Sequence, residues 1–255
     1  MPPARFSARA LVALLSLGVI AVGFGLLLFL VEDRWRPLLR VDEGARDDLH
    51  RYALDHPGFV TAMKIMSDVG SAFVYIPLFA VIALWLARQG RRRPAVFVAV
   101  ALIGGSLLNG LVKALVHRAR PVLPNPVAHA NGLSFPSGHA QSAVVATSVL
   151  LLVLLPRLRT TGARAAAVVL GVAFVVAIGF SRVALGVHFV SDVLAGYALG
   201  AAWVAALLAI GGPRYDPASR LNAPAASASS AAPHAGRGDD GDRAALPQPA
   251  ARRDR

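Results

Sequence analysis

The chain has 255 residues, of which 56% are hydrophobic, and a mean hydropathy of +0.57. Because the apolar residues lie in long blocks, this composition is typical of an integral membrane protein and excludes an ordinary soluble domain. The net charge of +12 would suit a nucleic-acid-binding protein, but the basic residues lie in short connections between the blocks, so we expect no nucleic-acid partner.

The first apolar block covers residues 10–31 and follows Arg5 and Arg9. A membrane-spanning helix needs roughly 20 apolar residues, and this block is long enough. A secretory signal peptide is the alternative, but its apolar core is shorter and ends in a small-residue cleavage site. This block instead runs into the charged residues 32–34, so we expect a retained first span.

The rest of the chain contains five further apolar blocks. Residues 32–57 form a polar connection with seven of the fourteen acidic residues, and the amphipathic residues 58–69 are expected at the membrane interface. The further spans are predicted at residues 70–87, 94–116, 138–155, 165–180 and 193–210. The predicted fold class is therefore all-α, a bundle of six transmembrane helices, with residues 1–212 as the membrane-embedded domain.

The composition changes beyond residue 211. Residues 213–255 consist mainly of Ala, Pro, Ser, Gly, Asp and Arg. Such a segment buries too little apolar area to offset its conformational entropy, so we expect a disordered cytoplasmic tail. His234 lies in it and is not expected to be catalytic.

Two connections are rich in arginine and carry no acid. Residues 88–93 contain four arginines, and residues 156–164 contain three. Short basic loops stay in the cytoplasm, which places both termini there and the other three connections outside. We expect a multi-pass protein of a bacterial inner (plasma) membrane.

Three polar clusters fall on the predicted outer side. They are residues 113–121 (KALVHRARP), 135–139 (FPSGH) and 181–192 (SRVALGVHFVSD). In the third, His188 and Asp192 are four residues apart, which on a helix brings both to one face. A carboxylate on one imidazole nitrogen fixes the tautomer and frees the other nitrogen for attack. By itself, the pair is more typical of a capping histidine beside a solvated aspartate.

The second cluster precedes a long apolar helix. Ser137 is expected to be its N-cap and Gly138 to lie in its first turn, where free backbone N–H groups attract anions. His139 would stand within reach of a bound anion. Ordinary capping explains this pattern equally well when it is taken alone.

The first cluster supplies cations. Lys113 and Arg120 are seven residues apart, close to two helical turns, with Pro121 expected to end the helix. Arg182 in the third cluster adds a guanidinium. Each cation alone could snorkel to the interface, but Lys113 lies within an apolar span, where a charge is costly and indicates function.

The chain contains no cysteine, and no carboxylate pair or His/Asp/Glu set with metal-ligand spacing accompanies these clusters, so we expect neither a metal nor a cofactor. Two histidines, one carboxylate, three cations and a helix N-terminus on one membrane face favour phosphoryl transfer by positioning and electrostatics.

Together, the three clusters resemble the three signature motifs of the type 2 phosphatidic acid phosphatase (PAP2) superfamily, in order and with the family's spacing. The resemblance implies that His188 is the nucleophile, Asp192 its orienting partner and His139 the acid and then the base. It implies that the phosphoryl group is bound by Lys113, Arg120, Ser137, Gly138 and Arg182.

The expected activity is hydrolysis of a lipid phosphate or diphosphate through a phosphohistidine, without metal. Undecaprenyl diphosphate is the first choice of substrate, followed by phosphatidylglycerophosphate and phosphatidic acid. The alternatives are a lipid phosphotransferase of the same family and a non-enzymatic transporter of anions or lipids. The sequence does not indicate an oligomeric state.

Overall fold

A computed structural model describes residues 8–211 of the chain. Its helices are α1 (Ala8–Glu32), α2 (Arg36–Asp55), α3 (Pro57–Val69), α4 (Ala72–Arg88), α5 (Arg92–Val116), α6 (Gly138–Leu154), the 3₁₀ turn η1 (Leu155–Arg157), α7 (Thr161–Ala184) and α8 (Val190–Gly211). No strand occurs in these residues, so the all-α class is confirmed. The predicted disorder of residues 213–255 lies outside the described residues.

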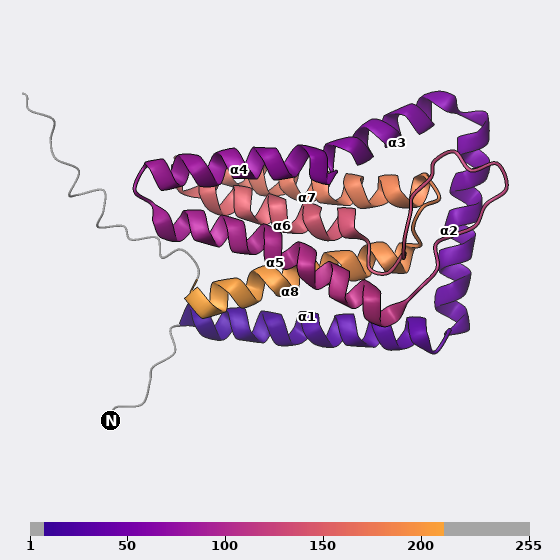
Figure 1. The fold of residues 1–255 in the computed structure, drawn as a ribbon, viewed down its shortest axis with the longest axis horizontal. Coiled ribbons are helices and arrows are strands. Elements are labelled where there is room, and N and C mark those ends of the chain that lie inside the picture. Colours follow the sequence, from indigo (N-terminus) through magenta and orange to yellow (C-terminus); the bar gives the residue numbers. More distant parts are fainter. Residues whose placement is uncertain (1–7, 212–255) are drawn as a thin grey trace, which may run out of the picture. The chain divides into compact units, whose positions relative to one another are not determined.

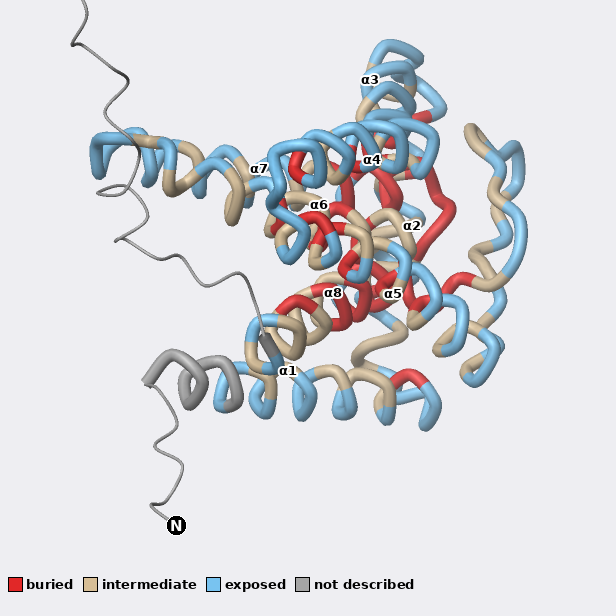
Figure 2. Tube along the Cα trace, turned by 60° about the vertical axis from the view of Figure 1, so that its left-hand side comes forward, coloured by how far each residue is buried: buried red, intermediate tan, exposed pale blue. Residues whose placement is uncertain are grey.

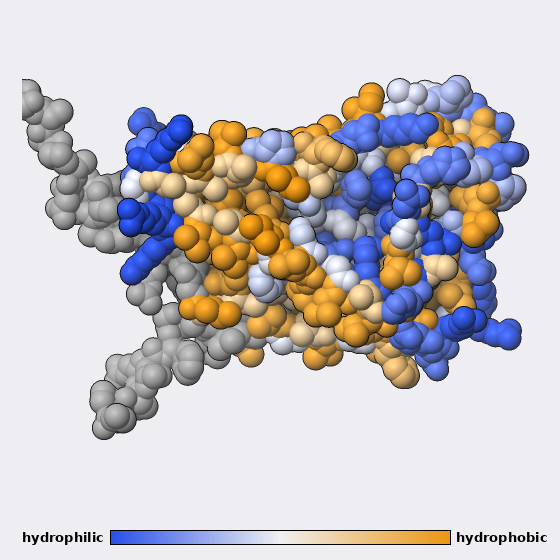
Figure 3. Space-filling view, viewed as in Figure 1, coloured by the Kyte–Doolittle hydropathy of each residue, from blue (hydrophilic) through white to orange (hydrophobic). Residues whose placement is uncertain are grey.

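Six apolar helical segments are long enough to cross a bilayer, as predicted. They are Leu15–Glu32, Pro57–Arg88, Arg92–Val116, Gly138–Arg157, Thr161–Ala184 and Val190–Ile210. Large apolar side chains on their outer surfaces remain exposed, including Phe73 (93%) and Leu107 (70%). In Figure 3, these surfaces form an apolar belt between two polar ends. A bilayer would cover this belt, and the protein is a multi-pass membrane protein.

The second apolar segment begins earlier than residue 70. Residues 57–69 form α3, which packs against α7 and leads through a short bend at Gly70 and Ser71 into α4. The helix that runs across the ends of the others is α2, as Figure 1 shows. Asp42 on α2 is buried, and its carboxylate accepts the N–H of Ser191 on α8. Figure 2 shows that most of the buried chain lies where α5, α6 and α8 pack together.

Successive long helices alternate in direction. The C-terminal ends of α5 and α7 and the N-terminal ends of α6 and α8 therefore meet at the end of the bundle that α2 crosses (Figure 1). The α4–α5 and α6–α7 connections, which carry the arginines, lie at the opposite end. The three polar clusters consequently share one end of the molecule.

Two glycines allow α6 and α8 to pack with their backbones in close approach. A Cβ atom on Gly196 would lie 2.5 Å from the carbonyl oxygen of Ser137, and one on Gly200 would lie 2.8 Å from that of Gln141. Small residues four apart permit such approaches in membrane helices. The contact places the beginnings of α6 and α8 side by side, where the Ser137 N–H donates to the Asp192 carbonyl at 2.9 Å. The second and third clusters are joined there.

Candidate active site

The structure brings residues of all three clusters into one polar region at the end of the bundle that α2 crosses. Arg120 Nη1 lies 3.1 Å from His188 Nε2, although the two residues are 68 positions apart. On the other side of the ring, His188 Nδ1 lies 3.3 Å from Asp192 Oδ2. The convergence expected from the sequence is therefore observed for these three side chains.

His188 and Asp192 form their contact differently from the prediction. His188 lies before α8, which begins at Val190, so the two residues do not share a helical face. Asp192 instead lies in the first turn of α8 and reaches back, where Oδ2 also accepts the Phe189 N–H at 2.9 Å. A carboxylate in this position stabilises the helix N-terminus while it orients the imidazole.

The partners of His188 determine its tautomer. Arg120 can only donate, so His188 Nε2 accepts with its lone pair and Nδ1 carries the hydrogen that faces Asp192. The side chain is only 2% exposed, and this burial lowers the pKa of His188 to about 4, although the hydrogen bond to Asp192 raises it. The imidazole is neutral near pH 7, with an unprotonated Nε2.

Arg120 reaches the site from a loop and not from a helix. The prediction that Pro121 ends the helix is wrong, because α5 ends at Val116. His117 follows in the left-handed conformation (φ 52°), and its N–H bonds to the carbonyl of Lys113. The Arg120 guanidinium donates to the carbonyl oxygens of Gly132 (3.0 Å) and Val187 (2.7 Å).

The other two predicted cations lie in the last turns of their helices. Lys113 on α5 donates to the Leu133 carbonyl at 2.6 Å. Arg182 on α7 is buried and donates to Ser67 on α3, while its Nε has no hydrogen-bond partner in the described residues. Across residues 15–210, neither these two cations nor Arg120 forms an ion pair with a carboxylate. In this part of the chain, therefore, no carboxylate neutralises their positive charges.

The first turn of α6 faces the same region. Ser137 is the N-cap, as predicted, and its hydroxyl oxygen accepts the Ala140 N–H at 3.5 Å. His139, in the same turn, lies within electrostatic range of Arg120, Arg182 and His188. It also lines a cavity of about 240 Å³ that extends between α4, α5 and α6.

The sequence reasoning missed an ion-pair network behind Asp192. Arg118 donates to Asp192 Oδ1 at 2.7 Å and to Asp42 Oδ2 at 2.8 Å, and its guanidinium lies 4.3 Å from the centre of the Phe189 ring. Asp42 also accepts the Ser191 N–H at 2.9 Å. Arg118 lies within the first cluster, but Asp42 pairs with it across 76 residues, and no local pattern marks such a partner.

Within residues 8–211, no three His, Asp or Glu side chains gather in an arrangement that could hold a metal ion. Asp192 and Asp42, the buried carboxylates near His188, are both occupied by Arg118. The independence from metal that we expect remains a prediction about the reaction.

Comparisons with known proteins agree with these motifs. The family model described as "PAP2 superfamily" matches residues 94–216. The chain is 30% identical to phosphatidylglycerophosphatase B of Bacillus subtilis over 146 residues, which cover 56% of this chain and 71% of the relative. It is also 30% identical to decaprenylphosphoryl-5-phosphoribose phosphatase of Mycobacterium tuberculosis over 164 residues, which cover 63% and 85%.

A third relative, the undecaprenyl-diphosphatase of Sulfolobus acidocaldarius, is 30% identical over 57% of this chain and 66% of its own length. Among solved structures, a transmembrane PAP2-type phosphatidylglycerolphosphate phosphatase from Bacillus subtilis has the same fold, with a TM-score of 0.69. That match covers 79% of this chain and 99% of the other, at 24% identity. The expected enzyme class, a phosphatase, is confirmed, and the chain belongs to the PAP2 superfamily.

Proposed function

We propose that the protein hydrolyses a lipid phosphate through a phosphohistidine at His188. The observation that carries this proposal is the position of the buried, neutral imidazole. Its Nδ1 faces the Asp192 carboxylate, and its unprotonated Nε2 faces the Arg120 guanidinium, which has no carboxylate partner among residues 15–210. A phosphate drawn to Arg120 would meet the nucleophilic nitrogen.

The phosphate would be bound by groups that lack a counter-charge. Arg120 and Arg182 would each donate to phosphoryl oxygens, and Lys113 would add a point charge from α5. The N–H groups at the start of α6, next to Ser137 and Gly138, would supply neutral donors and the positive end of the helix dipole. These groups stabilise the charge that develops on the equatorial oxygens in the transition state.

The reaction would proceed in two steps. His188 Nε2 attacks phosphorus, the bond from phosphorus to the lipid oxygen breaks, and protonated His139 gives its proton to the leaving alkoxide. Neutral His139 then takes a proton from water, the water oxygen attacks phosphorus, and the phosphorus–nitrogen bond breaks to release inorganic phosphate. Protein cations take the part that magnesium plays in many phosphoryl-transfer enzymes, so we expect no metal requirement.

Arg118 and Asp42 would act as positioning residues. Asp192 can orient His188 only if its own carboxylate is held, and Arg118 holds it from the side opposite the imidazole. Asp42 shares Arg118 and anchors the network to α2. A buried arginine between two carboxylates leaves a net negative charge beside His188, which favours the positive charge that the ring gains on phosphorylation.

The substrate is proposed to be a phosphorylated lipid. The relatives act on phosphatidylglycerophosphate, decaprenylphosphoryl-5-phosphoribose and undecaprenyl diphosphate according to their names. Undecaprenyl diphosphate, phosphatidylglycerophosphate and phosphatidic acid are the candidates for this chain. All three carry long apolar tails, which the exposed apolar surfaces of the helices would accommodate in the bilayer.

The site is proposed to lie on the outer face of a bacterial plasma membrane, with both termini in the cytoplasm. The two arginine-rich connections lie at the end of the bundle opposite His188, which agrees with the rule that basic loops stay inside. A reporter fused after Arg93 should give a cytoplasmic signal. An external signal there would overturn this orientation.

The proposed reaction is tested with the purified protein in detergent. Phosphate release is measured for a panel of lipid phosphates with and without EDTA, and rapid acid-free quenching with labelled substrate is used to detect phosphohistidine. We expect release that survives EDTA, inhibition by vanadate, and label that His188→Ala abolishes. Activity lost in EDTA and restored by a divalent ion would contradict the metal-free mechanism, and label on another residue would contradict the assignment of His188.

A further inference from the structure

Arg120, which faces His188, lies in a long connection between two helices. Residues 117–137 join α5 to α6 and contain no helix or strand. Figure 1 shows that this connection passes across α2. The position of Arg120 therefore depends on the contacts that hold the connection against other elements of the molecule.

Two side chains of α2 hold this connection. Asp42 accepts from Arg118 at 2.8 Å, and His50 Nε2 lies 2.8 Å from the carbonyl oxygen of Pro124. Arg120 lies between these two attachment points along the chain. A short segment that is attached at both ends has few conformations left, which favours one position of the residue between them.

The hydrogen-bonding state of His50 follows from its partner. A carbonyl oxygen can only accept, so Nε2 carries the hydrogen and Nδ1 carries the lone pair. His50 is 5% exposed, and its Nδ1 has no hydrogen-bond partner in the described residues. An unpaired buried acceptor costs free energy, which an aliphatic side chain in this place would avoid. Among the described residues, the N–H bond to Pro124 is therefore the contact for which a polar ring is needed.

The same connection contacts the segment that leads to His188. Gly186 has a left-handed backbone (φ 69°), and a Cβ atom on it would lie 2.4 Å from Leu123 Cδ1. The carbonyl oxygen of the next residue, Val187, accepts from Arg120 at 2.7 Å. Leu123 directly precedes the residue that α2 holds. A loosened connection would therefore disturb both contacts, and with them the distance between Arg120 and the imidazole.

We propose that His50 is a positioning residue that acts through Arg120. Its N–H bond to the Pro124 carbonyl holds the connection on α2 and thereby keeps the Arg120 guanidinium beside His188 Nε2, where the two atoms are 3.1 Å apart. A phosphoryl group bound by Arg120 is then presented to the nucleophile. This inference rests on the proposed function, and it adds a residue outside the three motifs and outside the region that the family model matches.

A double-mutant cycle in the full-length protein tests whether His50 acts through Arg120. His50→Leu removes the donor and fills most of the same space. We expect kcat/KM to fall by roughly tenfold, because a binding group that is slightly misplaced loses much of its effect. In an Arg120→Ala protein, His50→Leu should cause no further loss, since the group that it positions is already absent. A merely structural role would lower kcat/KM by the same factor in both backgrounds.

Three further variants accompany the cycle. His50→Gln keeps an N–H donor near the position of Nε2, so we expect kcat/KM within about twofold of the wild type. His50→Asn has a shorter amide that does not reach the carbonyl, and it replaces His50→Leu in the cycle if the latter does not fold. His56→Leu is the matched control, because the exposed His56 also contacts a backbone carbonyl, that of Tyr52 at 2.8 Å, but locally at the end of α2. It should keep wild-type kcat/KM.

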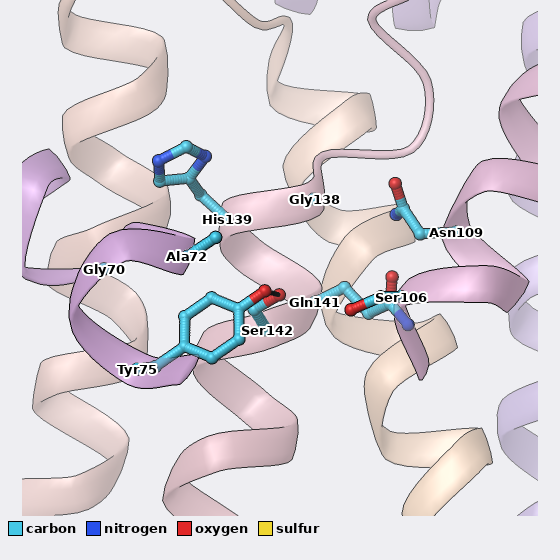
Figure 4. Close-up of a pocket in the computed structure, with 9 residues that line it drawn as sticks. All are labelled: Gly70, Ala72, Tyr75, Ser106, Asn109, Gly138, His139, Gln141 and Ser142. Carbon is cyan, nitrogen blue, oxygen red and sulfur yellow. Dashed lines mark hydrogen bonds between the residues drawn. The ribbon is translucent and has the colours of Figure 1, made fainter. Parts of the chain in front are cut away.

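These substitutions leave the cavity beside His139 unchanged. Figure 4 shows the nine residues that line it, and none of them belongs to α2 or to residues 117–137. A loss of activity in His50→Leu therefore does not come from an altered lining of this cavity.

Two measurements distinguish this inference from the proposed function. Phosphate release is measured with the lipid phosphate that the wild type hydrolyses fastest, and orthovanadate affinity is measured by isothermal titration calorimetry. We expect His50→Leu to weaken orthovanadate binding in the wild-type background and not in the Arg120→Ala background.

Unchanged kcat/KM and orthovanadate affinity in His50→Leu, or an equal loss in both backgrounds, would overturn the role of His50 while the hydrolase remains. If the wild type binds orthovanadate but hydrolyses no lipid phosphate, the proposed function falls, and the affinities alone decide whether His50 positions Arg120. If it does neither, both proposals fall.

Discussion

The two sides of His188 carry opposite kinds of electrostatics. On one side, Arg118 is shared between Asp42 and Asp192, and its charge is neutralised within the protein. On the other side, the partners of Arg120 within the described part of the chain are carbonyl oxygens and the imidazole itself. Arg118 and Arg120 are two residues apart in one loop, yet only the charge of Arg118 is neutralised by carboxylates of the described residues.

This difference shows that the partners of a cation decide its role more than its position in the sequence does. A guanidinium paired with two buried carboxylates is already satisfied and serves to hold them. A guanidinium paired with neutral acceptors retains its net charge and can exchange those acceptors for a phosphate. The comparison predicts that the two sides will respond differently to substitution.

The largest loss of activity should come from substitution of His188, which lies between Arg120 and Asp192. His188→Ala removes the nucleophile, and we expect kcat to fall by roughly 10⁴-fold or more, as in other enzymes that lose a nucleophile. Phosphate release from a lipid substrate measures this loss. His129→Ala, which changes an exposed histidine of the neighbouring loop, is the control and should keep normal turnover. Turnover that persists in His188→Ala would sink the proposed intermediate.

Removal of the unpaired arginine should damage activity and spare the fold. Arg120→Ala takes away a donor to the transition state, and we expect kcat/KM to fall by about 10²–10³-fold. The melting temperature in detergent should change little, because no carboxylate loses its partner. A large fall in melting temperature with near-normal kcat/KM would show that Arg120 is structural.

Removal of the paired arginine, Arg118, should lower the thermal stability of the protein more than removal of Arg120 does. Arg118→Ala leaves Asp42 and Asp192 buried without their counter-charge, a change that typically costs about 3–5 kcal/mol. We expect a clear fall in the melting temperature, measured by thermal unfolding in detergent beside Arg120→Ala. Equal melting temperatures for the two variants would refute the distinction between the two sides.

A milder substitution, at Asp42, should show how the network affects the position of His188 without a large loss of stability. Asp42→Asn keeps an acceptor for the Ser191 N–H but removes one of the two negative charges that pair with Arg118. We expect kcat to fall by roughly tenfold with KM nearly constant, because Asp192 and His188 are held less well. Steady-state kinetics on one lipid phosphate measure the split. A rise in KM alone would place Asp42 in substrate binding and contradict this assignment.

The smallest effect concerns pH. Protonation of His188 removes the Nε2 lone pair, and its pKa of about 4 predicts that activity limited by this group is full near neutral pH and falls only as the pH drops towards 4. Asp192→Asn removes a carboxylate that raises this pKa, so the acid limb of its pH–rate profile should move to lower pH. Ionisation of the substrate cancels when the two profiles are compared. A limb that moves upward would mean that His188 does not titrate as described.

The features that the sequence determined by itself are local ones. Six apolar blocks predict six spans because each helix meets the bilayer independently, and Ser137 before such a block predicts an N-cap because capping involves neighbouring residues. The three motifs also indicate the family, since their residue types and spacing are read directly from the chain.

Only the tertiary structure decided how these parts meet. The end of α5 at Val116 and the left-handed His117 place Arg120 in a loop, although the sequence has no glycine there and its proline comes five residues later. The pairing of Arg118 with Asp42, and the close approach of Gly196 on α8 to Ser137 at the start of α6, depend on contacts between distant segments. The residue type sets a side chain's charge and its hydrogen-bonding groups. Whether those groups are paired depends on packing between distant segments.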